Sequence, residues 1–270
     1  MAWKTRTKSP TAYSPKIELP PPDPLPNPED EKPYVPEYSM PKMKNYIDLV
    51  EMRELDVEGT KKLGEEVGYQ EGEDKWIWIK QDTGAWGGPA QDWKTQHRVK
   101  YFEKVKKFDV VVTAGANQGM YVRFYAKKFG MVYAFEPDPL NFHCMVINNQ
   151  FDNVVKIQAA LGEKNGFCTI QRNGFSNTGT WSVLEMPLEG HQPIPLLTLD
   201  SMKFDVLDLL QLDTEGYELN VLKGAKGTIK RLKPVIIAEN GHMQSVREFL
   251  EALDYTHVGQ SAADHIYVPK

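Results

Sequence analysis

A glycine-rich turn and an acidic residue, each placed directly after an apolar stretch, are the features of this sequence best suited to binding a ligand. The run GANQG occupies positions 115–119, and Glu136 ends the next apolar stretch. Glycine permits a sharp turn and lets a ligand approach the backbone closely. A carboxylate at the end of the following strand suits a two-pronged grip on the hydroxyls of a ribose. Together these features predict a site for an adenosine-type cofactor.

The spacing of the glycines distinguishes between two kinds of adenosine cofactor. A dinucleotide site usually carries G-x-G-x-x-G, because a pyrophosphate rests on the N-terminus of the following helix. Here three residues separate Gly115 from Gly119, and Asn117 is the middle one. S-adenosylmethionine has no phosphate and needs only room for its amino-acid tail. The spacing therefore favours S-adenosylmethionine over the nicotinamide cofactor of an oxidoreductase.

Acidic and amide side chains after two later apolar stretches offer groups for a chemical step. They are Asp213 and Glu215 after one stretch, and Glu239, Asn240 and His242 after the other. A hydroxyl that receives a methyl group must lose its proton to a positioned base or to a metal-bound partner. Either Asp213 or Glu215 is the general base, helped by His242, or Asp213, Glu239 and Asn240 bind Mg²⁺. Both interpretations stay open, and Glu215 and Glu218 also suit the first turn of a helix.

The elements that would position these groups alternate between strands and helices from residue 101 to residue 270. Apolar runs typical of buried parallel strands lie at 108–113, 131–135, 154–159, 205–212 and 234–238. Helical spacing occurs at 117–129, 139–150, 218–231 (interrupted at 223–224) and 245–253. Residues 255–258 and 265–268 predict a terminal antiparallel hairpin, and 166–195 is expected to be extended and loop-like. This order predicts a doubly wound, mostly parallel α/β sheet.

The first hundred residues differ in composition from the rest of the chain. Eleven of the nineteen prolines lie in residues 1–41, which predicts an extended arm. This arm is either a disordered tail or a segment that wraps its own subunit or a second copy, as in a homo-oligomer. Residues 42–100 carry four tryptophans near a glycine-rich loop at 84–89, with a strand predicted at 75–80 before this loop and a helix predicted at 91–107 after it. They are interpreted either as a lid on the acceptor side or as a layer packed on the main domain.

Composition and charge argue against several classes of protein. The net charge is −5, whereas nucleic-acid binding usually requires a strongly basic face, so no nucleic-acid partner is expected. The two cysteines form neither a disulfide framework nor a CxxC metal motif. The sequence has no secretory signal and no apolar run of ~18 residues that would span a membrane. We therefore expect a cytoplasmic protein.

Four blocks of the sequence occur in the order and spacing of a known enzyme family. AGANQG, VYAFEPDPLNF, LLQLDTEGYELNVLKGA and KPVIIAEN resemble the FkbM-type methyltransferases over roughly Val110–Asn240. The resemblance implies a class I methyltransferase (Rossmann-like) fold with a seven-stranded sheet, and S-adenosylmethionine as the cofactor. It also implies O-methylation of a hydroxyl on a small molecule or sugar. The cofactor-binding residues it implies are Thr113, Gly115, Ala116, Asn117, Gly119, Glu136, Pro137, Gln158, Ala159 and Asp213.

One position departs from the pattern of this family. An aspartate usually stands where this chain has Thr113, which keeps an oxygen but removes the charge. Cofactor affinity is then reduced, another acid substitutes, or the chain is a non-catalytic binding or structural module with a methyltransferase fold. The sequence DTEG at 213–216 lacks the Asn/Asp-Pro-Pro-aromatic motif of enzymes that methylate amino groups of nucleic-acid bases. A small-molecule or saccharide acceptor is therefore the expected partner.

Overall fold

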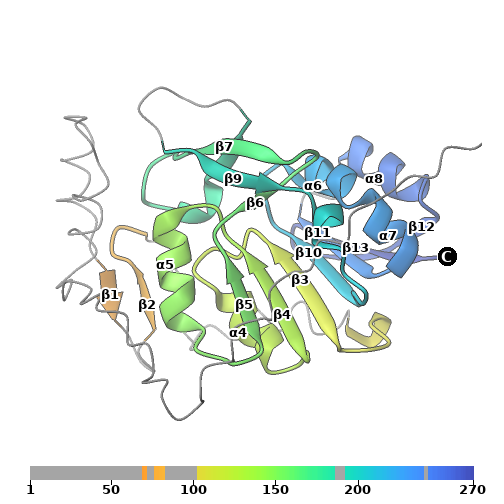
Figure 1. Cartoon of the computed structure of the whole chain (residues 1–270), viewed down its shortest axis with the longest axis horizontal. Helices are drawn as coiled ribbons and strands as arrows, with labels where there is room; N and C mark the ends of the chain where they lie inside the picture. Colours follow the sequence, from red (N-terminus) through yellow and green to blue (C-terminus); the bar gives the residue numbers. More distant parts are fainter. Residues whose placement is uncertain (1–68, 72–75, 83–101, 186–191, 240–242) are drawn as a thin grey trace, which may run out of the picture. The chain divides into compact units, whose positions relative to one another are not determined.

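A computed structural model describes residues 69–71, 76–82, 102–185, 192–239 and 243–270 of the chain. All of these residues belong to one compact unit, Met43–Lys270 (Figure 1). The proline-rich arm predicted at 1–41 lies outside the described residues, as does the glycine-rich loop at 84–89. Of the helix predicted before the main domain, the described end contains only a short 3₁₀ helix, η3 (Phe102–Lys104).

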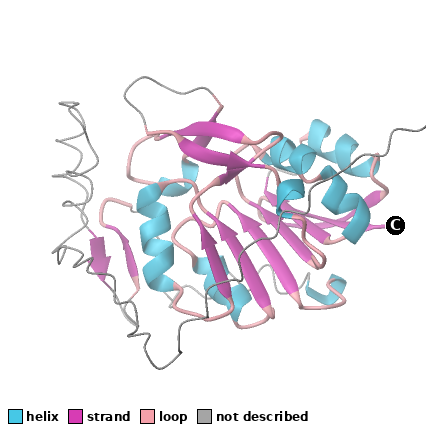
Figure 2. Ribbon diagram, viewed as in Figure 1, coloured by secondary structure: helices cyan, strands magenta, loops and turns pink. Residues whose placement is uncertain are grey.

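Seven strands form the central sheet, in which one strand runs against the others (Figures 1 and 2). In spatial order they are β12 (Tyr255–Ser261), β13 (Asp264–Pro269), β11 (Val235–Glu239), β10 (Leu209–Leu212), β3 (Val110–Ala114), β4 (Met131–Phe135) and β5 (Val154–Ile157). Strands β11, β10, β3, β4 and β5 are parallel, and β13 is antiparallel to both β11 and β12. The predicted class I methyltransferase fold and its terminal hairpin are confirmed.

Apolar side chains alternate between the two faces of this sheet and build a core on each face. On one face, Val112 and Leu210 pack with α6 (Glu218–Gly224), α7 (Lys226–Leu232) and α8 (Gln244–Glu251). On the other face, Val111 and Leu209 pack with α4 (Met120–Ala126) and α5 (Pro139–Asn148). Burial on both faces explains why the strands read as nearly continuous apolar runs.

The interruption predicted within the helical stretch 218–231 has a steric cause. Helix α6 ends at Gly224, and α7 begins two residues later. A side chain at Gly224 would place its Cβ 1.8 Å from the backbone oxygen of Gly162. Only glycine therefore lets the end of α6 approach the strand β6 (Ala160–Leu161) and the turn that follows it.

A second, four-stranded sheet forms where the sequence is expected to be loop-like. It consists of β6, β9 (Ile194–Leu197), β7 (Gly166–Gln171) and β8 (Ser182–Leu184), in that spatial order. The described residues of 166–195 include extended stretches, as predicted, but the expectation of a loop is wrong for β7, β8 and the start of β9, because side chains such as Cys168 and Ile170 are buried in a third apolar cluster. In Figure 2 this sheet lies beyond the arrowheads of the central strands. It is thus placed at the edge where ligands bind in sheets of this kind.

Two short strands precede the main domain in the described residues. Strand β1 (Tyr69–Glu71) pairs antiparallel with β2 (Ile77–Ile79), which matches the strand predicted at 75–80. Within the described ranges, the structure contains no helix long and apolar enough to cross a lipid bilayer.

Candidate cofactor and acceptor site

The carboxyl ends of β3, β4, β10 and β11 meet around a single cavity of about 350 Å³. Its wall includes the residues of the glycine-rich turn and the acidic strand ends that the sequence singles out. The predicted site residues that line it are Gly115, Ala116, Asn117, Glu136, Pro137, Ala159, Asp213, Glu215 and Glu239. The second sheet contributes Leu161, Ile170 and Val183.

The glycine-rich turn closes one end of the cavity with left-handed backbone. Gly115 has a φ of 78°, Asn117 of 49° and Gly119 of 90°. The backbone nitrogens of Gly115 and Ala116 both donate to the oxygen of Phe135 at 3.0 Å. A Cβ on Gly115 would lie 1.7 Å from the backbone oxygen of Asp213. Glycine is therefore required at 115 both by its φ and by the close approach of β10.

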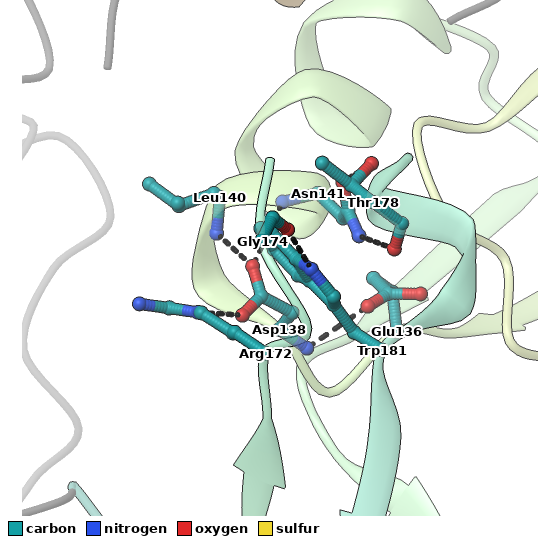
Figure 3. Close-up of polar contacts among 8 residues, drawn as sticks. All are labelled: Glu136, Asp138, Leu140, Asn141, Arg172, Gly174, Thr178 and Trp181. Atoms are coloured by element: carbon teal, nitrogen blue, oxygen red, sulfur yellow. Dashed lines mark hydrogen bonds and ion pairs between the residues drawn. The ribbon is translucent and has the colours of Figure 1, made fainter. Parts of the chain in front are cut away.

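Glu136 is held beside this turn by two backbone groups. Its side chain is 5% exposed, and its Oε2 accepts a hydrogen bond from the Asn117 nitrogen at 2.7 Å. Its Oε1 accepts from the Asp138 nitrogen at 2.9 Å (Figure 3). Burial, reinforced by the nearby Asp138 carboxylate, raises the pKa of Glu136 to about 8. The turn and the carboxylate, predicted separately from sequence, therefore share one pocket.

An aromatic wall beside Glu136 was not identified from the sequence. Asp138 caps α5 by accepting from the Leu140 nitrogen at 2.8 Å, and it pairs with Nε of Arg172 at 2.8 Å (Figure 3). The Arg172 guanidinium lies 5.2 Å from the ring centre of Trp181, which lines the cavity. Trp181 donates from Nε1 to the oxygen of Gly174 at 2.6 Å. The β7–β8 hairpin thus supplies an aromatic surface within reach of an adenosine.

Three carboxyl groups cluster at the ends of β10 and β11. Oxygens of Asp213, Glu215 and Glu239 all lie within 4.8 Å of one another. Burial, the charge of Asp213 and a hydrogen bond with Asp213 raise the pKa of Glu239 to about 9. Burial and the charges of Asp213 and Glu218 raise the pKa of Glu215 to about 7. The raised pKa of Glu239 favours its protonated form near neutral pH, in which it can donate a hydrogen bond to Asp213.

Glu218 shapes the loop that carries Asp213 and Glu215. Its Oε1 accepts from the backbone nitrogens of Thr214 at 3.0 Å and Gly216 at 3.2 Å. This is the helix-start role that the sequence leaves open for Glu218, and it fixes the loop between β10 and α6. Glu215, with a φ of 53°, lies on the cavity wall.

Several predicted site residues do not reach the cavity wall. Thr113 is fully buried and donates its hydroxyl proton to Oε1 of Gln211, its partner on β10. Thr113 is not among the residues that line the cavity. Gln158 and Gly119 are not among the lining residues either, although Gly119 ends the turn. His242 and Asn240 lie outside the described residues.

The lining of the cavity is strongly acidic. Six of the lining residues carry carboxyl groups, and no lysine, arginine or histidine lies among the described ones. The six are Glu136, Asp138, Asp213, Glu215, Glu239 and Asp264. No basic side chain of the described lining can balance a phosphate group, while those of the carboxyl groups that are ionised attract a cation.

Comparisons with known proteins give one family match and several distant likenesses. A curated relative, the hexuronic acid methyltransferase AglP of Haloferax volcanii, is 26% identical over 141 residues. That alignment covers 50% of this chain and 57% of AglP, so the chain spans little more than half the length of this relative.

Solved structures resemble the chain at low sequence identity. The FkbM methyltransferase of Methylobacillus flagellatus has a TM-score of 0.41 and 16% identity, and the match covers 82% of this chain and 57% of that one. A Streptococcus mutans protein solved in complex with SAH has a TM-score of 0.40 and 11% identity, with coverage of 64% and 94%. An rRNA methylase of Streptococcus thermophilus has a TM-score of 0.39 and 14% identity, with coverage of 65% and 94%.

The family match covers more than half of the chain and spans most of the cavity wall. It runs over residues 114–257, from the end of β3 into β12. It therefore takes in the glycine-rich turn, Glu136, the second sheet and the carboxyl groups at the ends of β10 and β11. The chain belongs to the FkbM methyltransferase domain family, whose cofactor is S-adenosylmethionine.

Proposed function

We propose that this chain transfers the methyl group of S-adenosylmethionine to a hydroxyl of a small, uncharged, saccharide-like acceptor. The observation that carries the proposal is one acidic cavity at the carboxyl edge of the central sheet. Glu136 lines it after β4, and the hydrogen-bonded pair Asp213 and Glu239 lines it at the ends of β10 and β11.

The cavity fits the cofactor in shape and in charge. Each oxygen of Glu136 accepts one backbone N–H and retains a lone pair for a ribose hydroxyl. Gly115 lets the loop after β10 pack directly against the glycine-rich turn at the edge of the cavity. The acidic wall suits a sulfonium and an ammonium group, whereas it disfavours the pyrophosphate of a dinucleotide.

The carboxyl pair is suited to receive a proton from a hydroxyl. When bound, the cofactor supplies an electrophilic methyl group on a positively charged sulfur. The acceptor oxygen forms the new bond to carbon while the bond from sulfur to carbon breaks, and the hydroxyl proton needs a base. Because Glu239 keeps its proton near neutral pH and shares it with Asp213, Asp213 is left as the acceptor of the new proton.

The acidic wall also supports an uncharged acceptor rich in hydroxyls. Carboxylates accept hydrogen bonds from hydroxyls, while a phosphorylated or carboxylated acceptor would meet like charges from Glu215 and Asp264. A saccharide acceptor agrees with the relative AglP, a hexuronic acid methyltransferase, although a hexuronic acid would need a counter-charge that the described lining does not offer.

Two substitutions within the carboxyl pair test the proton transfer. Asp213→Asn should lower kcat by about 10²–10⁴-fold, because an amide cannot take the proton, while S-adenosylmethionine affinity stays nearly unchanged. Glu239→Gln is the matched control, since its amide N–H replaces the proton that Glu239 donates, and it should retain most turnover near pH 7. The assay measures transfer of a radiolabelled methyl group to a panel of neutral and charged sugars. Equal activity of Asp213→Asn and the wild type would remove Asp213 from the mechanism.

The same three carboxylates also offer oxygen ligands for a divalent cation such as Mg²⁺. A bound cation would displace the proton shared by Asp213 and Glu239, so the two arrangements exclude each other. Turnover measured after chelation and again after adding Mg²⁺ distinguishes them, because only the metal-dependent enzyme loses activity. A calorimetric titration that detects no S-adenosylmethionine binding would instead support the non-catalytic module.

A further inference from the structure

A buried carboxylate from the segment before the family match braces the wall of the cavity. Asp82 follows β2 and is 4% exposed. Its Oδ2 accepts from Nε2 of Gln118 at 3.0 Å, and from Oγ1 of Thr178 at 2.6 Å. The backbone nitrogen of Thr178 lies 3.4 Å from the same oxygen. Gln118 and Thr178 both line the cavity, whereas Asp82 stands behind them.

Thr178 is the residue through which this brace reaches the ligand space. It begins the short helix η4 (Thr178–Thr180), and its oxygen accepts from Nδ2 of Asn141 on α5 at 3.3 Å. Its Oγ1 lies 3.0 Å from Oδ1 of Asn141 (Figure 3). A Cβ on the next residue, Gly179, would lie 3.4 Å from Nδ2 of Asn117. The turn 177–179 is therefore packed directly against the glycine-rich turn.

The segment that carries Asp82 is held at its other end by the side-chain amide of Asn148. The side chain of Asn148, at the end of α5, accepts from the Ile77 nitrogen at 2.8 Å and donates to the Ile77 oxygen at 2.9 Å. It also donates to the oxygen of Gln118 at 2.9 Å. Trp76, adjacent to Ile77, is buried and lines the cavity. The segment 76–82 is thus docked on the core at both of its ends.

We infer that Asp82 is a positioning residue of the cofactor site, which holds the turn 177–179 and Gln118 in place around S-adenosylmethionine. The inference rests on the proposed function, because it assigns Asp82 a role in holding that cofactor. Hydrogen bonds to an ionised oxygen are stronger than neutral ones, and three donors converge on Oδ2 of Asp82. Without this oxygen, the backbone nitrogen of Thr178 loses its acceptor, while Gln118 Nε2 keeps only Thr178 Oγ1 at 3.2 Å and Thr178 Oγ1 keeps only Asn141 Oδ1 at 3.0 Å, so the turn is held less firmly.

Two substitutions at position 82 test this role: alanine removes the oxygen that accepts the three hydrogen bonds, and asparagine keeps an acceptor oxygen. Asp82→Ala should weaken S-adenosylmethionine binding by roughly 10–100-fold, measured by calorimetry. It should also speed amide hydrogen exchange across residues 174–180 in the absence of any ligand. Asp82→Asn keeps an acceptor oxygen and should recover most of both properties.

The control removes another carboxylate that accepts hydrogen bonds from backbone nitrogens but does not line the cavity. Asp200 accepts from the backbone nitrogens of Gly227 at 2.8 Å and Thr228 at 2.7 Å, and it does not line the cavity. Asp200→Ala should therefore lower thermal stability while leaving the Kd for S-adenosylmethionine and exchange at 174–180 unchanged. An equal loss of affinity in Asp200→Ala would show that general destabilisation explains both variants, and the inference would fall.

A double-mutant cycle tests whether Asp82 acts on the affinity for S-adenosylmethionine through Thr178. Thr178→Val removes the hydroxyl that bonds Asp82, so Asp82→Ala should cost little further affinity in that background. Fully additive losses would contradict the inference, as would wild-type affinity and exchange in Asp82→Ala. If the wild type binds no S-adenosylmethionine, the proposed function fails, and the exchange comparison still decides whether Asp82 holds the turn.

Discussion

Removing the Glu136 carboxylate tests the cofactor site most directly. Both of its oxygens are held by backbone N–H groups at 2.7 and 2.9 Å, so its orientation is set before any ligand arrives. Glu136→Ala deletes the acceptors for the two ribose hydroxyls. Hydrogen bonds to a charged group contribute about 1.5–3 kcal/mol when made, and solvent partly replaces them in the enlarged cavity. We expect a loss of about 1–3 kcal/mol, which corresponds to a Kd for S-adenosylmethionine raised about 5–150-fold.

The raised pKa of Glu136 adds a pH dependence to the same experiment. Because the pKa of the free protein's Glu136 lies at about 8, binding that uses the ionised carboxylate must release a proton below that pH. Affinity should then fall about tenfold for each pH unit below 8 and level off above it. Calorimetry in buffers of different ionisation enthalpy should detect the released proton. Glu136→Gln cannot titrate, so its weaker affinity should lack this pH dependence.

The pH dependence of the free energy of unfolding gives an independent check that the pKa of Glu136 is raised on folding. A carboxyl whose pKa rises from 4.5 to about 8 on folding favours the folded state most at pH values below about 4.5. That contribution is lost as the pH rises from about 4.5 through about 8. The stability of Glu136→Gln relative to wild type should therefore increase across this window. Glu163→Ala, which removes an exposed carboxylate paired with Lys223, is the control and should change neither affinity nor its pH dependence.

The assignment of Glu136 would be refuted by one combined result. If Glu136→Ala and Glu136→Gln bind S-adenosylmethionine as the wild type does, with the same dependence on pH, the carboxylate does not contact the ribose. A loss of affinity that is identical at pH 6 and pH 9 would preserve the contact but contradict the raised pKa.

Two further substitutions concern the glycine-rich turn and the strand before it. Gly115→Ala should abolish S-adenosylmethionine binding in calorimetry, because its Cβ would collide with the Asp213 oxygen. Gly166→Ala, with no atom within 4 Å of its Cβ and no positive φ, should bind normally. Wild-type affinity in Gly115→Ala would mean that β10 can move away. Thr113→Val should lower the free energy of unfolding in urea by about 1–3 kcal/mol, since Gln211 loses its buried partner, while the Kd stays unchanged. Weaker binding without a loss of stability would instead give Thr113 a role at the cofactor.

The central sheet could be predicted from sequence because its strands are apolar on both faces. The run 131–135 forms a strand with the same bounds, whereas the runs 154–159 and 205–212 form strands only over Val154–Ile157 and Leu209–Leu212. The acidic strand ends followed from the same pattern, since the carboxyl ends of parallel strands meet at one edge of a sheet. Glu136 and Asp213 were therefore expected near each other before any coordinates were considered.

The hydrogen-bond partners of buried polar side chains could not be predicted from sequence patterns. Thr113 reads as a cofactor residue from its place in the family pattern, but its hydroxyl bonds Gln211, which lies 98 positions away on a neighbouring strand. Asp82 and Thr178 are 96 positions apart, and no local periodicity links them. The strands of the second sheet are short and separated by glycine- and asparagine-rich turns, so Trp181 could not be assigned to the cavity wall.

The bounds of the family match and the bounds of the cavity do not coincide, and this difference bears on the choice of acceptor. The match begins at residue 114 and ends at 257, yet Trp76 lines the cavity from before it, and Ala262 and Asp264 line it from beyond its end. Asp264 pairs with Glu239 across β13 and β11, so the acidic end of the cavity is completed by the terminal hairpin. Residues inside the match supply the groups that any member needs to hold S-adenosylmethionine. We predict that Asp264, which lies outside the match and beside Glu239, faces the acceptor, so that Asp264→Asn should change the acceptor preference more than the cofactor affinity.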